Sequence, residues 1–336
     1  MEHVIVDKFG AFVGKKSERL VIREEGKVVS EIPFADVEQL TITSGGVSLS
    51  TDAIRECVEH GIQINFLSGS GNPYAKITSP SLSGTVITRR EQVLAYNDRR
   101  GVHLSCAFVE GKVRNQTNVL KYFAKHRRTA DREVYEKLYD AARKMEDIGR
   151  ELDGIKGDRI DEVRGLLLAI EGRAANHYWQ MVQEVLLDKI DFPGRERRGA
   201  TDPLNSMLNY AYGILYQQIW GAVMLAGLEP FAGFLHVDRP GKPSLVLDFI
   251  EEFRAQVVDR TVIAMVSRGF RPEMEEDRLS QATRRELAER ILERLDAEER
   301  YESKKHRLRT VIQRQARHIA TFLRGEGNYR PFIGGW

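Results

Sequence analysis

Cysteine is scarce in this chain, and its scarcity excludes two classes of small, cross-linked protein. The 336 residues include two cysteines, Cys57 and Cys106. Two thiols cannot build a disulfide framework, and they cannot supply the ligands of a cysteine-rich zinc site. We therefore expect a protein of a reducing, cytoplasmic setting.

Long apolar runs are missing as well. The opening residues, MEHVIVDKFG, contain no basic stretch that leads into an apolar run, as a signal peptide requires. The nearest approach to a membrane span, residues 204–228, is too polar for that role. It is interrupted by four amide side chains, Asn205, Asn209, Gln217 and Gln218. We expect a protein that is neither exported nor inserted into a membrane.

An excess of one charge is absent overall but present locally. The net charge of +2 says nothing about a polyanionic partner. From Tyr301 onward, however, eight lysines and arginines are accompanied by only two acids. Such an asymmetry is typical of a surface that contacts phosphates, and a solvated helix face is the alternative. The predicted phosphate contacts are the KHRR run at residues 125–128, Lys304, Lys305, Arg307, Arg314 and Arg317.

Residues 1–88 have the pattern of short β-strands. RLVIREEGKVVSEIP consists of two alternating runs around a Glu-Gly turn, which indicates a hairpin. VEQLTIT, VSLS and IQINFLS predict further strands. One short helix is expected between them, capped by Ser50 or Thr51 and ended by Gly61. This part of the chain therefore predicts a small β-sheet or sandwich domain.

Residues 89–336 have helical periodicity instead. The helix that begins near Pro203 has Asp202 as its expected N-cap and Gly227 just past its end. It is apolar nearly all round and is therefore expected at the centre of its domain. The predicted fold class is α+β, with a small N-terminal β domain at residues 1–88 followed by a larger all-α domain at residues 89–336.

The segment SLVLDFIEEFRAQVVD predicts a helix with carboxylates on one side. With Ser244 as its cap, its acidic side chains fall in one arc roughly 100° wide. These side chains are Asp248, Glu251, Glu252 and Asp259. A solvated acidic face is the simplest interpretation, and a cation site is the other.

Glu171 favours the cation site, because its helix is apolar around it. The predicted apolar stripe contains Leu167, Leu168, Ala174, Ala175, Tyr178 and Val182. A lone carboxylate there would lose several kcal/mol of solvation unless it were paired or neutralised. An ion pair with an arginine would satisfy it, and so would a metal ion. Gly172, Ala174 and Ala175 leave room beside it.

His236 is the third element, on a loop or turn before the acidic segment. Most single histidines are packing or surface residues. One imidazole with two or three carboxylates, however, makes a hard site that suits Mg²⁺ or Mn²⁺. Such a site fits phosphodiester chemistry, in which the ion polarises a phosphoryl oxygen.

Several segments at these positions resemble one known family. In order they are AIEGRAANHYW, DPLNSMLNYAYGILY, GLEPFAGFLH and KPSLVLDFIEEFR, preceded by IPFADVEQLTI, STDAIRECVEHGI and RREQ. They are similar to the integrase of CRISPR spacer acquisition, the first-numbered CRISPR-associated protein. The C-terminal GNYRPFIGGW lies outside these motifs.

The resemblance implies an N-terminal β domain, a helical catalytic domain and a homodimer. It places the catalytic glutamate at Glu171 and the histidine at His236. The third metal ligand is Glu251 as first choice, with Asp248 close behind. Asn205 matches the asparagine at the start of a family helix and is a candidate DNA contact. The implied partners are double-stranded and branched DNA and the small second-numbered adaptation protein.

The predicted function is a metal-dependent DNA endonuclease and integrase that inserts short foreign fragments into a CRISPR repeat array by transesterification. The alternative is a non-catalytic or structure-specific helical protein of DNA binding or repair. A small-molecule metallohydrolase has less support, because no glycine-rich or aromatic ligand pocket is evident. The β domain is expected to form the dimer. Its apolar residues, such as Val4, Val6, Phe9 and Phe12, exceed what one thin sheet can bury.

Overall fold

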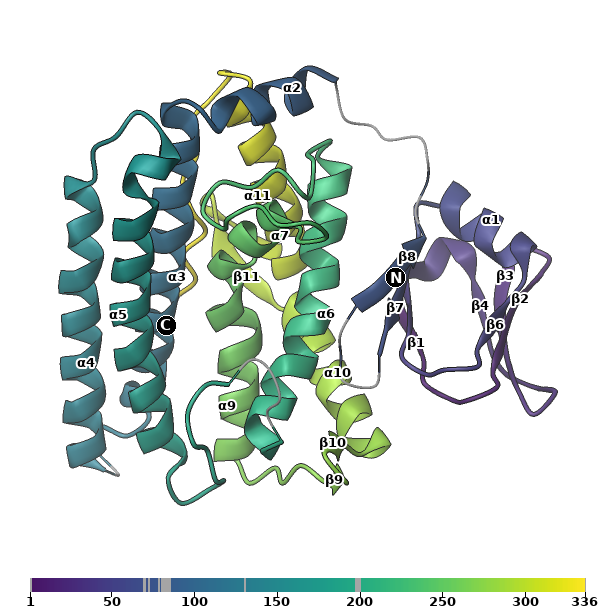
Figure 1. The fold of residues 1–336 in the computed structure, drawn as a ribbon. Coiled ribbons are helices and arrows are strands. Elements are labelled where there is room, and N and C mark those ends of the chain that lie inside the picture. Colours follow the sequence, from purple (N-terminus) through teal and green to yellow (C-terminus); the bar gives the residue numbers. More distant parts are fainter. Residues whose placement is uncertain are drawn as a thin grey trace.

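Two four-stranded β-sheets form the N-terminal domain (Figure 1). The computed structural model describes residues 2–68, 71, 73–77, 79, 86–129, 131–196 and 201–335. The first sheet has the strand order β1 (Glu2–Val6), β5 (Val37–Ile42), β7 (Gln63–Leu67) and β8 (Pro73–Ile77). The second has the order β4 (Lys27–Pro33), β3 (Arg19–Glu24), β2 (Phe12–Lys16) and β6 (Ser48–Leu49).

The two sheets share one apolar core, as a sandwich does. Val6 and Leu40 of the first sheet and Val13 and Leu20 of the second belong to the same buried cluster. The predicted hairpin is β3 and β4, joined at Gly26 with φ +80°. The predicted short helix is α1 (Thr51–Glu59), in which the Ser50 hydroxyl accepts from the Ala53 N–H. A short 3₁₀ turn, η1 (Phe34–Asp36), precedes β5.

Long helices build the second domain. Three of them, α3 (Arg99–Lys125), α4 (Arg132–Arg150) and α5 (Ile160–Leu186), pack side by side (Figure 1). The others are α2 (Val86–Ala95), α6 (Pro203–Leu225), α9 (Arg260–Ser267), α10 (Gln281–Asp296) and α11 (Leu308–Leu323), with a 3₁₀ turn, η2 (Glu151–Gly154), after α4. As predicted, α6 is central and mostly buried, and Asp202 caps it by accepting from the Asn205 N–H at 2.9 Å.

The acidic segment is not the single helix that its sequence predicts. It consists of α7 (Ser244–Phe249), α8 (Glu251–Phe253) and a π-helical turn, η3 (Arg254–Asp259). Ser244 is not its cap: the Ser244 hydroxyl donates to the Phe231 carbonyl at 2.6 Å instead. Single π-helical turns within helices occur often at functional sites.

Two small hairpins interrupt the helical domain. They are β9 (Met274–Glu275) with β10 (Arg278–Leu279), and β11 (Glu298–Tyr301) with β12 (Lys304–Arg307). The second hairpin carries basic residues that the sequence assigns to a helix. The α+β class of a β domain followed by a mostly helical domain is confirmed. The boundary between residues 88 and 89 stays a prediction, and residues 80–85 lie outside the described part of the chain.

The two domains touch closely along α6. A Cβ on Gly213 would lie 1.7 Å from the Gly71 carbonyl oxygen, so only glycine allows this approach of backbones. Farther along the contact, the guanidinium of Arg309 donates to Glu38 of β5 and to Asp296, each at 2.9 Å. None of the helices in the described ranges is long and apolar enough to cross a bilayer.

Candidate metal site

Lys112 joins the two glutamates that the sequence selects. Its ammonium contacts the Glu171 carboxylate on α5 and lies 2.8 Å from Oε2 of Glu251 on α8. Lys112 itself comes from α3, and its side chain is 7% exposed. A buried lysine is stable only beside anions, and each buried anion is stable only beside a cation. Helices α3, α5 and α8 therefore meet at one charged centre.

Glu251 has a second cationic neighbour. The Nε atom of Arg254 lies 3.3 Å from Oε1 of Glu251. Burial disfavours the ionised form of Glu251, but Arg254, Lys112 and, more weakly, His236 hold its pKa at about 2. Glu251 is therefore an anion at neutral pH, in a place where an isolated carboxylate would not ionise.

His236 is held in one orientation by Asp248. Oδ1 of Asp248 accepts the ring Nδ1–H of His236 at 2.7 Å and its backbone N–H at 2.8 Å. The other oxygen accepts the backbone N–H groups of Phe234 and Leu235, at 2.7 and 3.0 Å. Because a carboxylate can only accept, Nδ1 is the donor in this bond, which leaves Nε2 as the ring atom that could bind a cation. Gly233 permits this tight loop, since a Cβ there would lie 2.8 Å from Asp248.

The four carboxylates of residues 248–259 do not form a solvated face. All four are buried, at 1% exposure or less, so that interpretation is wrong. Asp248 binds a loop, Glu251 binds Lys112 and Arg254, and the other two carboxyls bind tyrosines. The segment is enclosed on all sides, which a pattern of one apolar and one acidic side does not predict.

The two tyrosine-bound carboxyls have raised pKa values. Burial raises the pKa of Glu252 to about 8, although the Tyr329 hydroxyl and the Phe332 N–H donate to it. The neutral form of Glu252 is therefore favoured near pH 7. Burial also raises the pKa of Asp259 to about 6, against the hydrogen bonds from Tyr212 and Tyr178.

The surroundings of Glu171 agree in part with the predicted stripe. Leu167 and Ala174 are fully buried, whereas Leu168 is 41% exposed and lies on the outer side of the helix. A Cβ on Gly172 would meet no atom within 4 Å because Gly172 is exposed, so the room expected beside Glu171 stays a prediction. The expected ion-pair partner is a lysine, Lys112, rather than an arginine.

The residues present fit a divalent cation, although they are not yet arranged around one. Within the described residues, no group of three or more His, Cys, Asp or Glu side chains stands in a metal-binding arrangement. The Lys112 ammonium lies between Glu171 and Glu251 instead. Both oxygens of Glu251 are buried, and neither receives a well-directed hydrogen bond. Two carboxylates and one imidazole nitrogen are a donor set that Mg²⁺ and Mn²⁺ accept.

The candidate phosphate contacts differ in whether acidic side chains already pair with them. Lys304 and Arg317 are exposed, and no ion pair is found for either among the described residues. The other three pair with acids: Lys305 with Glu298, Arg307 with Asp296 and Arg314 with Glu302. Within the KHRR run, Arg127 is half-buried and donates to the carbonyls of Phe123 and Val185. These paired residues carry less free charge than their sequence indicates.

Asn205 does not lie on a surface. It is fully buried. Its Oδ1 accepts from Arg195 at 2.8 Å, and its Nδ2 donates to the Gly194 carbonyl at 2.7 Å. It therefore organises the turn before α6, and a direct DNA contact would require its exposure.

The sequence analysis did not predict that Lys112 and Arg254 are the cationic neighbours of Glu251. A signal for Lys112 does exist, because the buried face of α3 contains Lys112, Asn115 and Gln116 among apolar residues. Polar side chains on such a face need internal partners. Arg254 carries no comparable signal, since an arginine after two glutamates is ordinary for a surface helix.

The fold and the site together define a class of protein. A β-sandwich precedes a helical domain in which Lys112 contacts two glutamates from different helices, Glu171 and Glu251. A sequence model of the family "CRISPR associated protein Cas1" matches residues 4–293. The chain belongs to the Cas1 family.

Curated relatives match this sequence over nearly its whole length. The chain is 40% identical to the CRISPR-associated endonuclease Cas1 1 of Archaeoglobus fulgidus, over 99% of each protein. It is 34% identical to the CRISPR-associated endonuclease Cas1 of Korarchaeum cryptofilum, over 96% of this chain and 95% of the other. The predicted family and enzyme class, an endonuclease, are confirmed. Dependence on a divalent metal ion goes with this class.

Solved structures share the fold. A structure described as a casposase bound to integration product has a TM-score of 0.81 at 23% identity, covering 99% of this chain and 93% of the other. A Cas1 protein from Thermotoga maritima has a TM-score of 0.77 at 18% identity, covering 98% and 100%. A "Cas6-RT-Cas1--Cas2 complex" also aligns, with a TM-score of 0.77 at 20% identity over 99% of this chain and 36% of the other.

Proposed function

We propose that this chain joins short DNA fragments to CRISPR repeat DNA at a site formed by Glu171, Glu251 and His236. The observation that carries the proposal is the junction of Glu171 and Glu251 at one buried cationic centre. These two carboxylates and Nε2 of His236 would hold Mg²⁺ or Mn²⁺. The bound ion would polarise a phosphoryl oxygen and stabilise the charge that develops in the transition state.

The chain's own residues contribute orientation and charge. Asp248 keeps the proton on Nδ1 of His236, so that Nε2 would be available as a ligand. Arg254 and Lys112 keep Glu251 ionised despite its burial. In the reaction, the 3′-hydroxyl of a fragment attacks a phosphodiester of the repeat. The new P–O bond replaces the old one, and the released 3′-oxygen takes up a proton. With water as the nucleophile, the same site cleaves DNA.

Double-stranded and branched DNA is the proposed substrate class. The exposed Lys304 and Arg317 are suited to bind its phosphates without reading sequence. The Cas2 protein, the second-numbered adaptation protein, is the proposed partner, as in the aligned Cas1–Cas2 complex.

The β domain is the proposed dimer contact. Its predicted surplus of apolar residues is partly buried, since Val4 and Val6 are 6% and 2% exposed. Phe9 and Phe12 remain 78% and 39% exposed, and Val28 and Val29 on the edge strand β4 are 52% and 53% exposed. An edge strand with apolar side chains is a usual place for chains to pair. A dimer would hold two sites apart, one for each end of a fragment.

The decisive experiment combines the protein with Mn²⁺, fragment DNA and a repeat-bearing plasmid. Glu171→Gln, Glu251→Gln and His236→Ala should each lower the covalently joined product at least about 100-fold. Glu146→Gln is the matched control, because Glu146 pairs with Lys121 on the outer part of α3 and should keep full activity. If all three site variants fold and keep metal-dependent joining, the chain is instead a DNA-binding protein that uses another site or none.

A further inference from the structure

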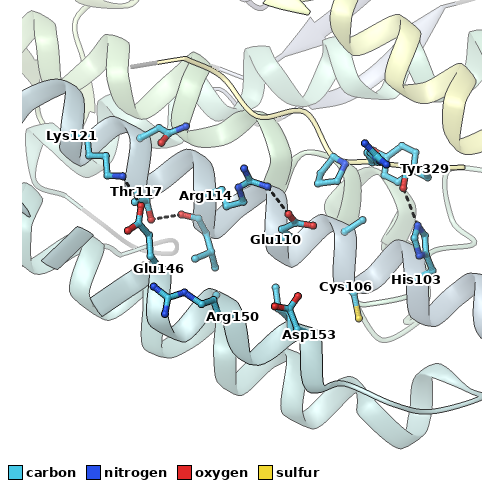
Figure 2. A pocket seen from close by; sticks show the side chains of 17 residues that line it. His103, Cys106, Glu110, Arg114, Thr117, Lys121, Glu146, Arg150, Asp153 and Tyr329 are labelled. Atoms are coloured by element: carbon cyan, nitrogen blue, oxygen red, sulfur yellow. Dashed lines mark hydrogen bonds and ion pairs between the residues drawn. The ribbon is translucent and has the colours of Figure 1, made fainter. Parts of the chain in front are cut away.

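The C-terminal strap, residues 327–335, lies against the candidate site although no motif and no part of the matched family region covers it. It follows α11 as an extended segment and runs along α3, as Figure 2 shows in yellow. It is not a loose tail. Tyr329 and Phe332 are 2% and 1% exposed.

Side chains of α3 bind the strap through its backbone. Nδ2 of Asn115 donates to the Phe332 carbonyl at 2.8 Å, and Oδ1 accepts the Gly334 N–H at 2.8 Å. Nε2 of His103 lies 2.9 Å from the Tyr329 carbonyl oxygen (Figure 2). Since carbonyl and amide groups of the strap are satisfied by side chains, the strap has one defined position.

The strap also binds the residue next to Glu251. The Tyr329 hydroxyl donates to Oε1 of Glu252, and the Phe332 N–H donates to Oε2 at 3.0 Å. Asn115 donates to the Glu252 backbone carbonyl at 2.7 Å, using the same amide group that binds the strap. The Phe332 ring stacks on Phe253, with centroids 5.3 Å apart and planes 8° apart.

The acidic segment around Glu251 and Glu252 depends on these contacts with the strap. Helix α8 comprises only Glu251–Phe253, and a π-helical turn follows it directly. The helical run is irregular at this point, because the Phe253 N–H donates to the Ile250 carbonyl and π-helical bonding begins at Arg254. Space is also tight, because a Cβ on Gly111 would lie 2.8 Å from Glu252 and 3.0 Å from Pro331.

We propose that the strap positions Glu251 for metal binding, with Tyr329 acting through Glu252. Neither Tyr329 nor Glu252 touches the reacting atoms, so both are positioning residues. This inference rests on the proposed role of Glu251 as a ligand. Removing the Tyr329 hydroxyl leaves the ring packing intact but frees the Glu252 side chain, so the Glu251 carboxylate spends less time in its binding position.

The test measures Mn²⁺ affinity by the free-Mn²⁺ paramagnetic resonance signal, together with joining rates at low and saturating Mn²⁺. Tyr329→Phe should raise the Mn²⁺ dissociation constant roughly three- to tenfold, and saturating Mn²⁺ should restore the rate. Glu252→Ala, which removes both acceptors of the strap donors, should act in the same direction. Tyr210→Phe, a buried tyrosine of α6 far from these contacts in the sequence, is the matched control.

The outcomes separate the two proposals. If Glu251→Gln loses Mn²⁺ affinity while Tyr329→Phe and Glu252→Ala bind Mn²⁺ as the wild type does, the strap has no positioning role. Equal losses in Tyr329→Phe and Tyr210→Phe would also overturn it, because they report general destabilisation. If Glu251→Gln itself keeps wild-type affinity, the proposed function fails and this inference fails with it.

Discussion

Asp248 and His236 are joined twice, once through the backbone and once through the ring. A single oxygen, Oδ1 of Asp248, accepts the His236 backbone N–H at 2.8 Å and its Nδ1–H at 2.7 Å. The position of the residue and the rotation of its ring are thus set by one atom. Because Asp248 is fully buried and already accepts four N–H groups, it is poorly placed to be a metal ligand as well.

Asp248→Asn tests whether Asp248 orients His236 rather than binding the metal ion. An amide has one acceptor oxygen and cannot receive all four donors, so the His236 ring should lose its fixed tautomer. We expect joining to fall about 10- to 100-fold. Glu251→Gln should have the larger effect on Mn²⁺ affinity. Asp238→Asn, an exposed residue of the same loop, serves as control. An Mn²⁺ affinity that falls more in Asp248→Asn than in Glu251→Gln would make Asp248 the third ligand.

Lys112→Met removes the cation between Glu171 and Glu251. Without metal, the buried Glu251 and the partly buried Glu171 then lack their shared partner, and we expect unfolding free energy to fall by about 3–5 kcal/mol. Added Mn²⁺ should raise the melting temperature more in this variant than in the wild type, because metal binding replaces the lost charge. Lys121→Met, whose pair with Glu146 is more exposed, should change stability by only ~1 kcal/mol or less. A metal-free Lys112→Met protein as stable as wild type would contradict this account.

The raised pKa of Asp259 predicts how the stability of the protein depends on pH. Its pKa in the folded protein is raised to about 6, from the ordinary 3.8. The folded state therefore holds this proton more tightly, and the stabilisation is present below pH ~4 and lost as pH rises through about 6. Relative to Asp259→Asn, the wild type should lose roughly 3 kcal/mol across this window and stay level above it. Urea unfolding of both proteins from pH 4 to 8 checks this. A difference that does not vary with pH would show that Asp259 has no raised pKa.

DNA binding should depend on salt through the exposed cations. Lys304→Gln and Arg317→Gln should each reduce the slope of log K against log salt by about 1. Asn205→Ala should leave that slope unchanged, because Asn205 is buried beneath the surface. Fluorescence titrations of duplex and branched DNA at several salt concentrations measure the slopes. Unchanged slopes in the double variant Lys304→Gln, Arg317→Gln would place the DNA elsewhere.

The proposed dimer is tested at its apolar side chains. Phe9→Ser combined with Val29→Ser should convert the protein to a monomer by light scattering, since both lie exposed on the β domain. Leu187→Ser is the control, because Leu187 is 74% exposed in the helical domain. A double variant that remains a dimer would assign the contact to another surface.

Local chemistry explains which parts of the fold are predictable. Gly26 in its hairpin turn, Ser50 at the start of α1 and Asp202 with Pro203 at the start of α6 each act on residues within a few positions. The sequence alone therefore defines these elements. The break of the acidic segment into α7, α8 and a π-turn depends instead on packing by distant helices, and helical periodicity does not contain it.

The sequence names candidate ligands but does not predict their surroundings. Glu171 is conspicuous because a carboxylate on an apolar face needs a partner, and the family resemblance adds His236 and Glu251. Their roles as ligands stay predictions. Lys112 and the strap could not be assigned, because they reach the site from segments far away in the chain. The same distance explains the error about a solvated acidic face, since each carboxylate finds its partner elsewhere.

The strap has a consequence for how the protein is made. Tyr329 and Phe332 are synthesised after every helix that they contact. Until they emerge from the ribosome, Glu252 and Asn115 have no partners from this segment. A growing chain can therefore fold its β-sandwich and its long helices while Glu251 is still unsupported. The contacts that the strap makes beside Glu251 can therefore form only after the helices around them have been translated.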